Sequence, residues 1–560
     1  MLINLKLLCN IIPKQIVDLK KTDSNYFIIL IVSALLFIPF IGHIHLFDWD
    51  EINFAESARE MLQTGNYSIV QINFQPFWEK PPLFIWLQAF SMTIFGVNEF
   101  AARFPDAITG IATLLILYSI GKKFFNKSFG LLWVLAYGGS LLPHIYFKSG
   151  IIDPVFNLFM FLAVYFYTLF LTKNIEHKKS IAYIFISALF IGLSVLTKGP
   201  VGFLIVIMTI IIFHLFKWNE TKKLWKEFCL LVISSIAVSL VWFIILTLQS
   251  GTEIIQQFID YQIRLFRTED AGHGGPFYYH FIILLFGCFP ASIFALFSFR
   301  KDDSTDKRQQ YFKLFMLILL FVVLIIFSIV KTKIVHYSSM CYFPISFLCA
   351  YYIYKQKTEM NKNTLLSILI GVIGLAIALS VAIFPVSLLN KQWYIDTIKD
   401  QFTKAVLMAP VSWSYFDSIT GIIFAGFIII SMVLIQKNKL QRAFITLAFG
   451  TILVTQIILI QITPKIEKYT QSSAIEFYQS IASQDCYVEV LGFKSYAQLF
   501  YSLKKTPGRP ESLDKEWLLH GKIDKPVYFV TKISYNILQT GVPLEKIGEK
   551  NGFVFYRRNP

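Results

Sequence analysis

Long apolar runs separated by short polar segments make up most of the chain. Many of these runs approach the roughly 20 residues that are needed to cross the hydrocarbon core of a bilayer. A backbone surrounded by lipid has to satisfy its own hydrogen bonds, so each run is predicted to be an α-helix. The pattern therefore predicts an all-α polytopic membrane protein with about thirteen transmembrane helices. The expected spans are residues 26–46, 104–121, 129–146, 151–171, 181–197, 200–216, 228–248, 280–298, 312–330, 338–354, 364–385, 418–436 and 442–462.

The polar segments on one side of the predicted bundle are rich in lysine and arginine. When the spans are threaded alternately, seven basic segments fall on this side, from Lys14–Lys21 near the amino terminus to Lys437–Arg442. Lysine and arginine accumulate in cytoplasmic loops, so this side and the amino terminus are predicted to be cytoplasmic. Topology and contact with anionic headgroups then account for the net charge of +16, and no nucleic-acid partner is expected.

The opposite side carries the long connections. They are residues 47–103, 249–279 and 386–417, together with a tail that starts at about residue 463. Long connections on one face of a rigid scaffold are where binding and catalysis concentrate. Within the first, Ile52–Gln63 has the spacing of an amphipathic helix that stops at Gly65.

The tail loses the membrane composition and is predicted to be a small α/β domain outside the membrane. Alternating apolar positions predict its strands, and helical spacing predicts the helices between them. The expected strands are 486–493, 525–533 and 552–558, and the expected helices are 472–483 and 494–505. We therefore divide the chain into a transmembrane domain, 1–462, and a soluble domain, 463–560.

The composition agrees with a membrane protein. Hydrophobic residues make up 55% of the chain and charged residues only 15%, whereas soluble proteins carry about 25% charged residues. The six cysteines contain no Cys-x-x-Cys pair, which argues against a zinc knuckle or a disulfide framework.

Ionisable residues gather at the outer ends of the spans. Asp50 and Glu51 open the first outer connection in FDWDEINFAESAREM (47–61). Glu79 and Lys80 follow in FWEKPPLFIW, where two prolines stiffen the backbone beside the lysine. The other candidates at this face are Asp153, Lys198, Arg264, Arg267, Glu269, Asp270, His273, His336 and Tyr337.

Each candidate also has a purely structural explanation. Asp50 and Glu51 suit the start of a helix, where carboxylates offset the helix dipole. Lys80 and the other cations could reach toward headgroups, and Asp153 before Pro154 has the pattern of an N-cap. Taken together, however, cations and carboxylates at a membrane surface fit one chemical need. Cations stabilise a departing lipid phosphate, and a carboxylate accepts a proton from the attacking group.

The motifs also carry a family resemblance. FDWDEINFAESAREML, followed by FWEKPPLFIWLQAF and FGVNEFAARFPDAI, resembles bacterial membrane glycosyltransferases of the GT-C class, which include the aminoarabinose lipid A transferases and the protein O-mannosyltransferases. The resemblance implies a GT-C fold in the bacterial inner membrane with its catalytic loops and soluble domain on the periplasmic side. It implies inverting transfer of a sugar from a polyprenyl-phosphate donor to lipid A, another glycolipid, a glycan or a protein.

The resemblance also implies roles for individual residues. Asp50 and Asp153 would be the catalytic carboxylates, with Glu51, Glu79 and His336 in support. The donor phosphate would be bound by Lys80, Lys198, Tyr337 and either Arg264 or Arg267.

Two departures from the family leave the cofactor and the acceptor open. Some relatives bind a divalent metal through the glutamate of this motif and a pair of histidines, and the corresponding ligands here would be Glu79 and His273. Relatives commonly carry Arg-Tyr where this chain has Asn53-Phe54, so lipid A is not assigned as the acceptor.

A membrane transporter of a lipid or small solute is the alternative function. Transporters place ionisable residues near the bilayer midplane and often contain internal repeats. In this chain the charges cluster at one face and the middles of the spans are nearly free of charge. The distribution therefore favours an enzyme that works at the outer membrane surface.

Overall fold

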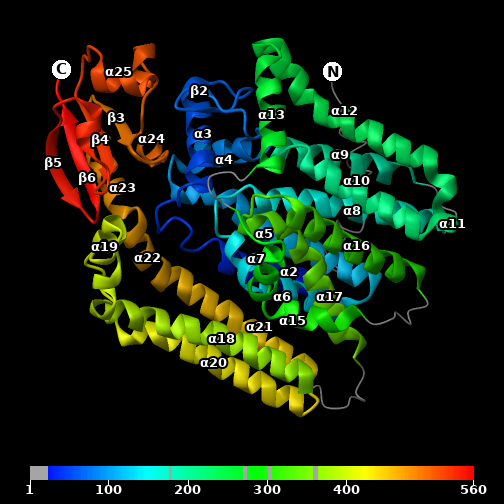
Figure 1. The fold of residues 1–560 in the computed structure, drawn as a ribbon. Helices are drawn as coiled ribbons and strands as arrows, with labels where there is room; N and C mark the ends of the chain where they lie inside the picture. The colour runs from blue at the N-terminus through cyan, green and yellow to red at the C-terminus, as the bar shows by residue number, and fades with distance from the viewer. Residues whose placement is uncertain (1–22, 176–179, 269–273, 300–305, 357–363) are drawn as a thin grey trace.

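The computed structural model describes residues 23–175, 180–268, 274–299, 306–356 and 364–560. It shows a large helical bundle with a small sheet domain at one end (Figure 1). The elements of the first half are α2 (Ser24–Phe37), α3 (Asp50–Thr64), β1 (Gln71–Ile72), β2 (Gln75–Pro76), α4 (Leu83–Phe95), α5 (Glu99–Phe124), α6 (Lys127–Gly138), α7 (Leu141–Tyr146), α8 (Asp153–Ile175), α9 (Ala182–Lys198), α10 (Val201–Phe216), α11 (Trp218–Thr221), α12 (Trp225–Ser250) and α13 (Glu253–Arg267).

The second half completes the bundle and forms the sheet domain. Its helices are α14 (Tyr279–Gly287), α15 (Ala291–Leu296), α16 (Lys307–Ile329), α17 (Tyr342–Lys355), α18 (Thr364–Leu389), α19 (Gln401–Leu407), α20 (Tyr415–Gln436), α21 (Leu440–Ile457), α22 (Thr463–Thr470), α23 (Ser472–Ile481), α24 (Ala497–Tyr501) and α25 (Lys515–His520). Its strands are β3 (Tyr487–Leu491), β4 (Val527–Lys532), β5 (Glu545–Lys550) and β6 (Phe553–Arg558).

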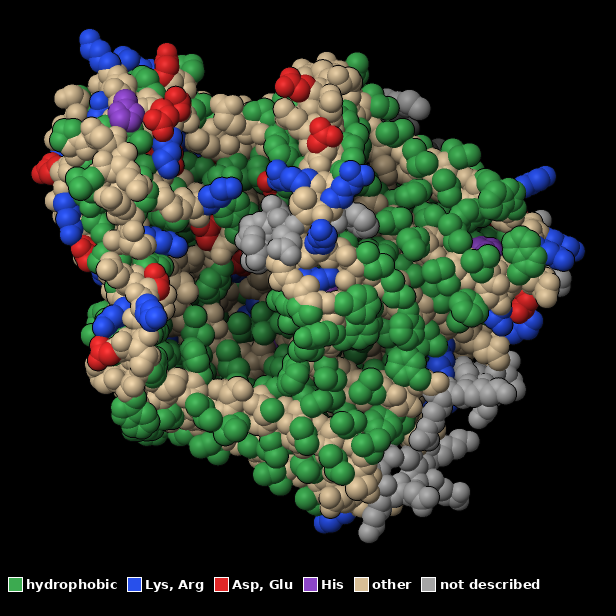
Figure 2. All heavy atoms as spheres, viewed as in Figure 1, with side chains coloured by type: hydrophobic (Ala, Val, Ile, Leu, Met, Phe, Trp, Pro, Cys, Tyr) green, Lys and Arg blue, Asp and Glu red, His purple; other side chains and the backbone are tan. Residues whose placement is uncertain are grey.

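The predicted multi-pass membrane architecture is confirmed. Within the described residues, seven helical stretches are long and apolar enough to cross a membrane, and α14 with α15 forms a further, sharply bent pair. Four shorter apolar helices, α2, α4, α9 and α10, accompany them, so the number thirteen stays a prediction. Apolar side chains cover most of the bundle surface in Figure 2, whereas acidic and basic ones gather over the C-terminal domain and α13.

The tail contains the predicted α/β domain. Its sheet has the order β3-β4-β6-β5, in which β3 and β4 run parallel and the other neighbours antiparallel. The sequence predicted three of the four strands and missed β5, because EKIGEK is polar, exposed and interrupted by a bulge between Lys546 and Gly548. A helical stretch runs without a break from Leu440 to Thr470, through the predicted domain boundary at 462. That boundary stays a prediction.

The first outer connection and the tail share one hydrophobic core. Ile52 and Phe54 from the connection pack in the same cluster as Tyr478 and Val530 from the tail, and all four are almost completely buried. The predicted helix of the first connection is α3, and it ends as expected at Gly65, whose φ of +70° suits glycine. Polar residues of α3 such as Glu56 are buried as well. The tail therefore covers the polar side of a helix that an amphipathic pattern alone would place at a surface.

Candidate active site

Three helix ends bring ionisable side chains to one place. Asp50 is the first residue of α3, Asp153 is the first residue of α8, and Lys198 is the last residue of α9. Lys198 Nζ lies 2.6 Å from Asp153 Oδ1. His336, between α16 and α17, joins the two carboxylates, because its Nε2 lies 3.7 Å from Asp50 Oδ2 and 3.9 Å from Asp153 Oδ2. The structure thus brings together four of the residues that the sequence predicted.

Lys80 approaches the same cluster from the turn before α4. Its Nζ lies 5.3 Å from the centre of the Tyr261 ring on α13, and the Arg264 guanidinium lies 5.1 Å from that ring. Burial lowers the pKa of Lys80, although the neighbouring carboxylates of Glu79 and Asp50 oppose this effect. The ring of Tyr261 therefore contacts two cations, Lys80 and Arg264, and each lies within the range of a cation–π interaction.

Tyr337 completes the side of the site that faces Lys198. The Lys198 ammonium lies 5.3 Å from the centre of the Tyr337 ring. Burial lowers the pKa of the adjacent His336, while the nearby Asp153 raises it and Lys198 lowers it. The net decrease keeps the imidazole neutral near pH 7, because the pKa of an unperturbed histidine is already about 6.5.

Asp153 is held by residues that the sequence analysis missed. Ser339 Oγ donates to Asp153 Oδ1 over 3.4 Å, and Asn157 Nδ2 donates to the same hydroxyl over 2.8 Å. The only available signal was position, since Asn157 lies one helical turn after Asp153 and Ser339 lies three residues after His336. Tyr261 was missed as well, because a tyrosine in an amphipathic helix carries no recognisable motif.

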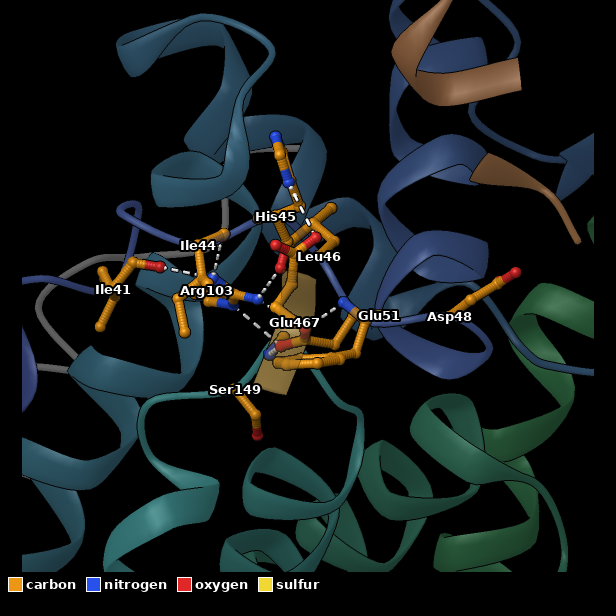
Figure 3. A network of polar contacts seen from close by, with 12 residues as sticks. Ile41, Ile44, His45, Leu46, Asp48, Glu51, Arg103, Ser149 and Glu467 are labelled. Carbon is orange, nitrogen blue, oxygen red and sulfur yellow. Dashed lines mark hydrogen bonds and ion pairs between the residues drawn. The ribbon is translucent and has the colours of Figure 1, made fainter. Parts of the chain in front are cut away.

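Glu51 and Arg103 form a structural pair beside the site. Arg103 donates to both oxygens of Glu51, over 2.9 and 2.7 Å, and both side chains are buried (Figure 3). Arg103 also donates to the backbone carbonyls of Ile41, Ile44 and His45. Burial would raise the pKa of Glu51, but the adjacent guanidinium holds it below its usual value. Glu51 therefore supports the site by fixing the start of α3.

Two further hydrogen bonds of the Glu51 carboxylate extend this support to α8. Glu51 accepts hydrogen bonds from the backbone amides of Phe47 and Gly150, over 2.8 and 2.6 Å. Gly150 lies in the turn that precedes Asp153, so one carboxylate ties the approach to Asp50 to the approach to Asp153.

The two candidate arginines of α13 lie in different surroundings. Arg264 contacts the Tyr261 ring, whereas Arg267 lines a pocket of about 390 Å³ next to α13. The other residues around this pocket are Pro200, Phe258, Ile259, Gln262 and Ile263. Since Pro200 follows Lys198 by two positions, the mainly apolar pocket begins close to the cation cluster.

Of the two predicted metal ligands, only Glu79 lies within the described residues. Glu79 lies beside Lys80, and His273 lies outside the described residues, as do Glu269 and Asp270. No three His, Cys, Asp or Glu side chains within the described part of the chain are arranged to hold a metal ion. The metal site stays a prediction, and the chemistry below is derived from the side chains that can be placed.

Comparison with known proteins identifies the fold and the family. A family model for dolichyl-phosphate-mannose-protein mannosyltransferases matches residues 79–242. The crystal structure of ArnT from Cupriavidus metallidurans bound to undecaprenyl phosphate has a similar fold, with a TM-score of 0.74 over 96% of this chain and 98% of that chain, at 16% identity. This match covers the bundle and the tail, and it confirms the predicted GT-C fold.

Curated relatives are similar in sequence too. The undecaprenyl phosphate-alpha-4-amino-4-deoxy-L-arabinose arabinosyl transferase of Pectobacterium atrosepticum is 26% identical over 65% of this chain and 66% of its own length. Its namesake from Wigglesworthia glossinidia brevipalpis is 30% identical over 68% of this chain and 69% of its own length. On this evidence the chain belongs to the family of the undecaprenyl phosphate-alpha-4-amino-4-deoxy-L-arabinose arabinosyl transferases.

Proposed function

We propose that the protein transfers a sugar from a polyprenyl-phosphate donor to an acceptor at the outer face of the bacterial inner membrane. The observation that carries this proposal is the convergence of Lys80 and Lys198 on the carboxylates of Asp50 and Asp153, with Arg264 on the Tyr261 ring that also contacts Lys80. The names of the relatives make 4-amino-4-deoxy-L-arabinose the first sugar to test. Lipid A, another glycolipid, a glycan or a protein could each serve as the acceptor.

The cations bind and stabilise the departing phosphate. Negative charge on the leaving phosphate increases as its bond to the sugar breaks, so fixed cations stabilise the transition state more than the bound donor. Lys80 and Lys198 supply compact charges, and Arg264 can engage two phosphate oxygens at once. Asp153 keeps Lys198 in position through their 2.6 Å contact.

Asp50 acts on the acceptor. Its side chain is about one-third exposed, so an acceptor can reach the carboxylate from solvent or from the membrane surface. The acceptor oxygen or nitrogen forms a bond to C1 of the sugar, the bond from C1 to the phosphate oxygen breaks, and Asp50 takes the acceptor proton. Attack from the face opposite the phosphate inverts the configuration at C1. The released product is polyprenyl phosphate.

The pocket beside α13 suits the first isoprene units of the donor. Phe258, Ile259 and Ile263 give it an apolar lining, and Arg267 contributes a cation to the same lining. A polyprenyl phosphate needs an apolar channel that ends at cations, and this pocket begins next to Pro200, two residues beyond Lys198.

The orientation follows from the charged segments. The basic connections support an amino terminus in the cytoplasm, and with it a periplasmic C-terminal domain on the same side as the carboxylates and cations of the site. The lipid-linked donor carries its own activated sugar, so a site on this side needs no nucleotide.

The test uses purified protein in detergent and a bacterial lipid extract, with wild type beside Asp50→Asn. Mass spectrometry follows the release of undecaprenyl phosphate, and the mass lost from the donor identifies the sugar. Release by the wild type alone supports the proposal. Equal release by both proteins removes Asp50 from the mechanism. Movement of solute into proteoliposomes without any carrier lipid, and without release of undecaprenyl phosphate, indicates a transporter instead.

A further inference from the structure

The segment His45–Trp49, which leads directly into Asp50, is held from two sides. The helical bundle holds one side, because Arg103 donates to the carbonyl of His45 over 2.9 Å and Glu51 accepts from the amide of Phe47 over 2.8 Å. The C-terminal part of the chain holds the other side, more than 400 positions away in sequence.

Gln471, between α22 and α23, uses both ends of its amide on this segment. Its Nε2 donates to the carbonyl of Leu46 over 2.6 Å, and its Oε1 accepts from the amide of Asp48 over 3.2 Å. The hydroxyl of Tyr501 on α24 accepts from the amide of Leu46 over 2.6 Å. The backbone on both sides of Leu46 is therefore bonded to the C-terminal domain.

Side-chain contacts reinforce these bonds at each end of the segment. His45 Nδ1 lies 3.0 Å from Glu467 Oε1 on α22. At the other end, the Trp49 ring packs against the Tyr496 ring with 4.9 Å between their centres. Trp49 is the N-cap of α3, and its indole N–H also donates to the side-chain amide oxygen of Asn53 over 2.9 Å. These contacts determine where α3 starts, and hence where Asp50 lies.

We infer that the C-terminal domain places the Asp50 carboxylate for catalysis, with Gln471 as the principal positioning residue. This inference rests on the proposed function, because it concerns the group that accepts the acceptor proton. Gln471 contacts Leu46 and Asp48 but none of the cations of the phosphate site. Its loss should therefore reduce turnover and leave donor binding unchanged. Misplacement of a catalytic group by about 1 Å can cost on the order of 100-fold in rate.

Three variants of the full-length protein test the inference. Gln471→Ala removes both amide contacts, and Tyr501→Phe removes the hydroxyl that accepts from Leu46 and also bonds Glu99. Gln484→Ala is the matched control, since this glutamine bonds Tyr528 inside the same domain and does not touch the segment. We expect kcat to fall roughly 10- to 100-fold in the first two variants. The KM for lipid donor, the affinity for undecaprenyl phosphate and the melting temperature should stay close to wild type.

A fourth variant separates positioning from a general loss of structure. Gln471→Glu still accepts from Asp48, but its ionised carboxylate faces the carbonyl of Leu46 and cannot donate. Protonation of the new carboxyl restores the donor. The activity of Gln471→Glu relative to wild type at the same pH should therefore rise as the pH falls from 8 to 5. The melting temperature is followed over the same pH range, because the pKa of Asp48 beside residue 471 is raised to about 6 and that of His45 is raised as well. A melting temperature that changes in parallel with the activity ratio would indicate a structural defect and overturn the positioning role.

The outcomes distinguish the two proposals. An active wild type with Gln471→Ala and Tyr501→Phe at wild-type kcat would overturn the positioning role and leave the glycosyl-transfer proposal intact. A fall in undecaprenyl phosphate affinity that matches the fall in kcat would also overturn it. A wild type that releases no undecaprenyl phosphate from an extract containing the donor would overturn the proposed function, and the inference with it.

Discussion

Lys198 Nζ lies 2.6 Å from Asp153 Oδ1, and the two side chains are only 12% and 3% exposed. The pair joins the end of α9 to the start of α8. An enclosed cation without a partner is costly, and the carboxylate lowers that cost before the donor arrives. The proposed phosphate would then approach a lysine that is already fixed in place.

Replacing Lys198 should therefore affect stability as well as activity. Lys198→Met leaves Asp153 buried without its cation, and breaking a buried pair in this way costs about 3 kcal/mol or more. We expect a lower melting temperature and no detectable release of undecaprenyl phosphate. The double variant Asp153→Asn with Lys198→Met removes both charges. Its melting temperature should recover toward wild type, while its activity should not. Recovery of activity in the double variant would show that Lys198 does not bind the donor.

Tyr261 provides a second test, on a residue that has no sequence motif. Its ring contacts both Lys80 and Arg264, and each cation–π contact contributes about 1 kcal/mol when partly desolvated. Tyr261→Leu should raise the KM for the lipid donor by about 10-fold or more, because both cations lose their support. Tyr261→Phe keeps the ring and should stay within a few-fold of wild type. Equal effects of the two substitutions would point to the hydroxyl instead.

The sequence predicted the parts of the fold that depend on periodicity. Apolar runs indicated the membrane helices, and alternating apolar positions indicated β3, β4 and β6. β5 was not predicted, because EKIGEK forms a strand through pairing with β6 and its own residues show no strand pattern. The burial of the polar side of α3 was not predicted either, for a related reason. It results from packing against the tail, and no local pattern reports on contacts between segments so far apart.

The site was predictable where a motif or a helix end carried the signal. Asp50, Lys80, Asp153, Lys198 and His336 all meet in the structure, because topology gathers the outer ends of the helices. The contacts that orient them were not predictable, since they come from residues of ordinary type at scattered positions. Those residues are Arg103, Asn157, Tyr261, Ser339, Gln471 and Tyr501.

Lys80 should set an alkaline limit on donor binding. Burial lowers its pKa below the ordinary value of 10.5, so it loses its charge at a lower pH than an exposed lysine. The KM for the donor should therefore rise as the pH increases through the pKa of Lys80. Lys80→Arg keeps its charge over this range, because arginine has a pKa above about 12. We expect the alkaline rise in KM to disappear in Lys80→Arg. The same rise in both proteins would assign it to another group.

The apolar pocket beside α13 leads to a prediction that contains its own control. Ile263 lines the pocket and is 46% exposed, so a charge there can be introduced without burying it in the protein core. Ile263→Glu should weaken binding of a long-chain donor, because an isoprene unit would then lie against a carboxylate. Each buried methylene group that loses its apolar contact costs about 0.8 kcal/mol. A short donor that carries a methyl group in place of the polyprenyl chain does not enter the pocket and should lose little affinity. We expect the KM for the long donor to rise at least about 10-fold and that for the short donor to change by less than about twofold. A parallel rise for both donors would place the polyprenyl chain elsewhere.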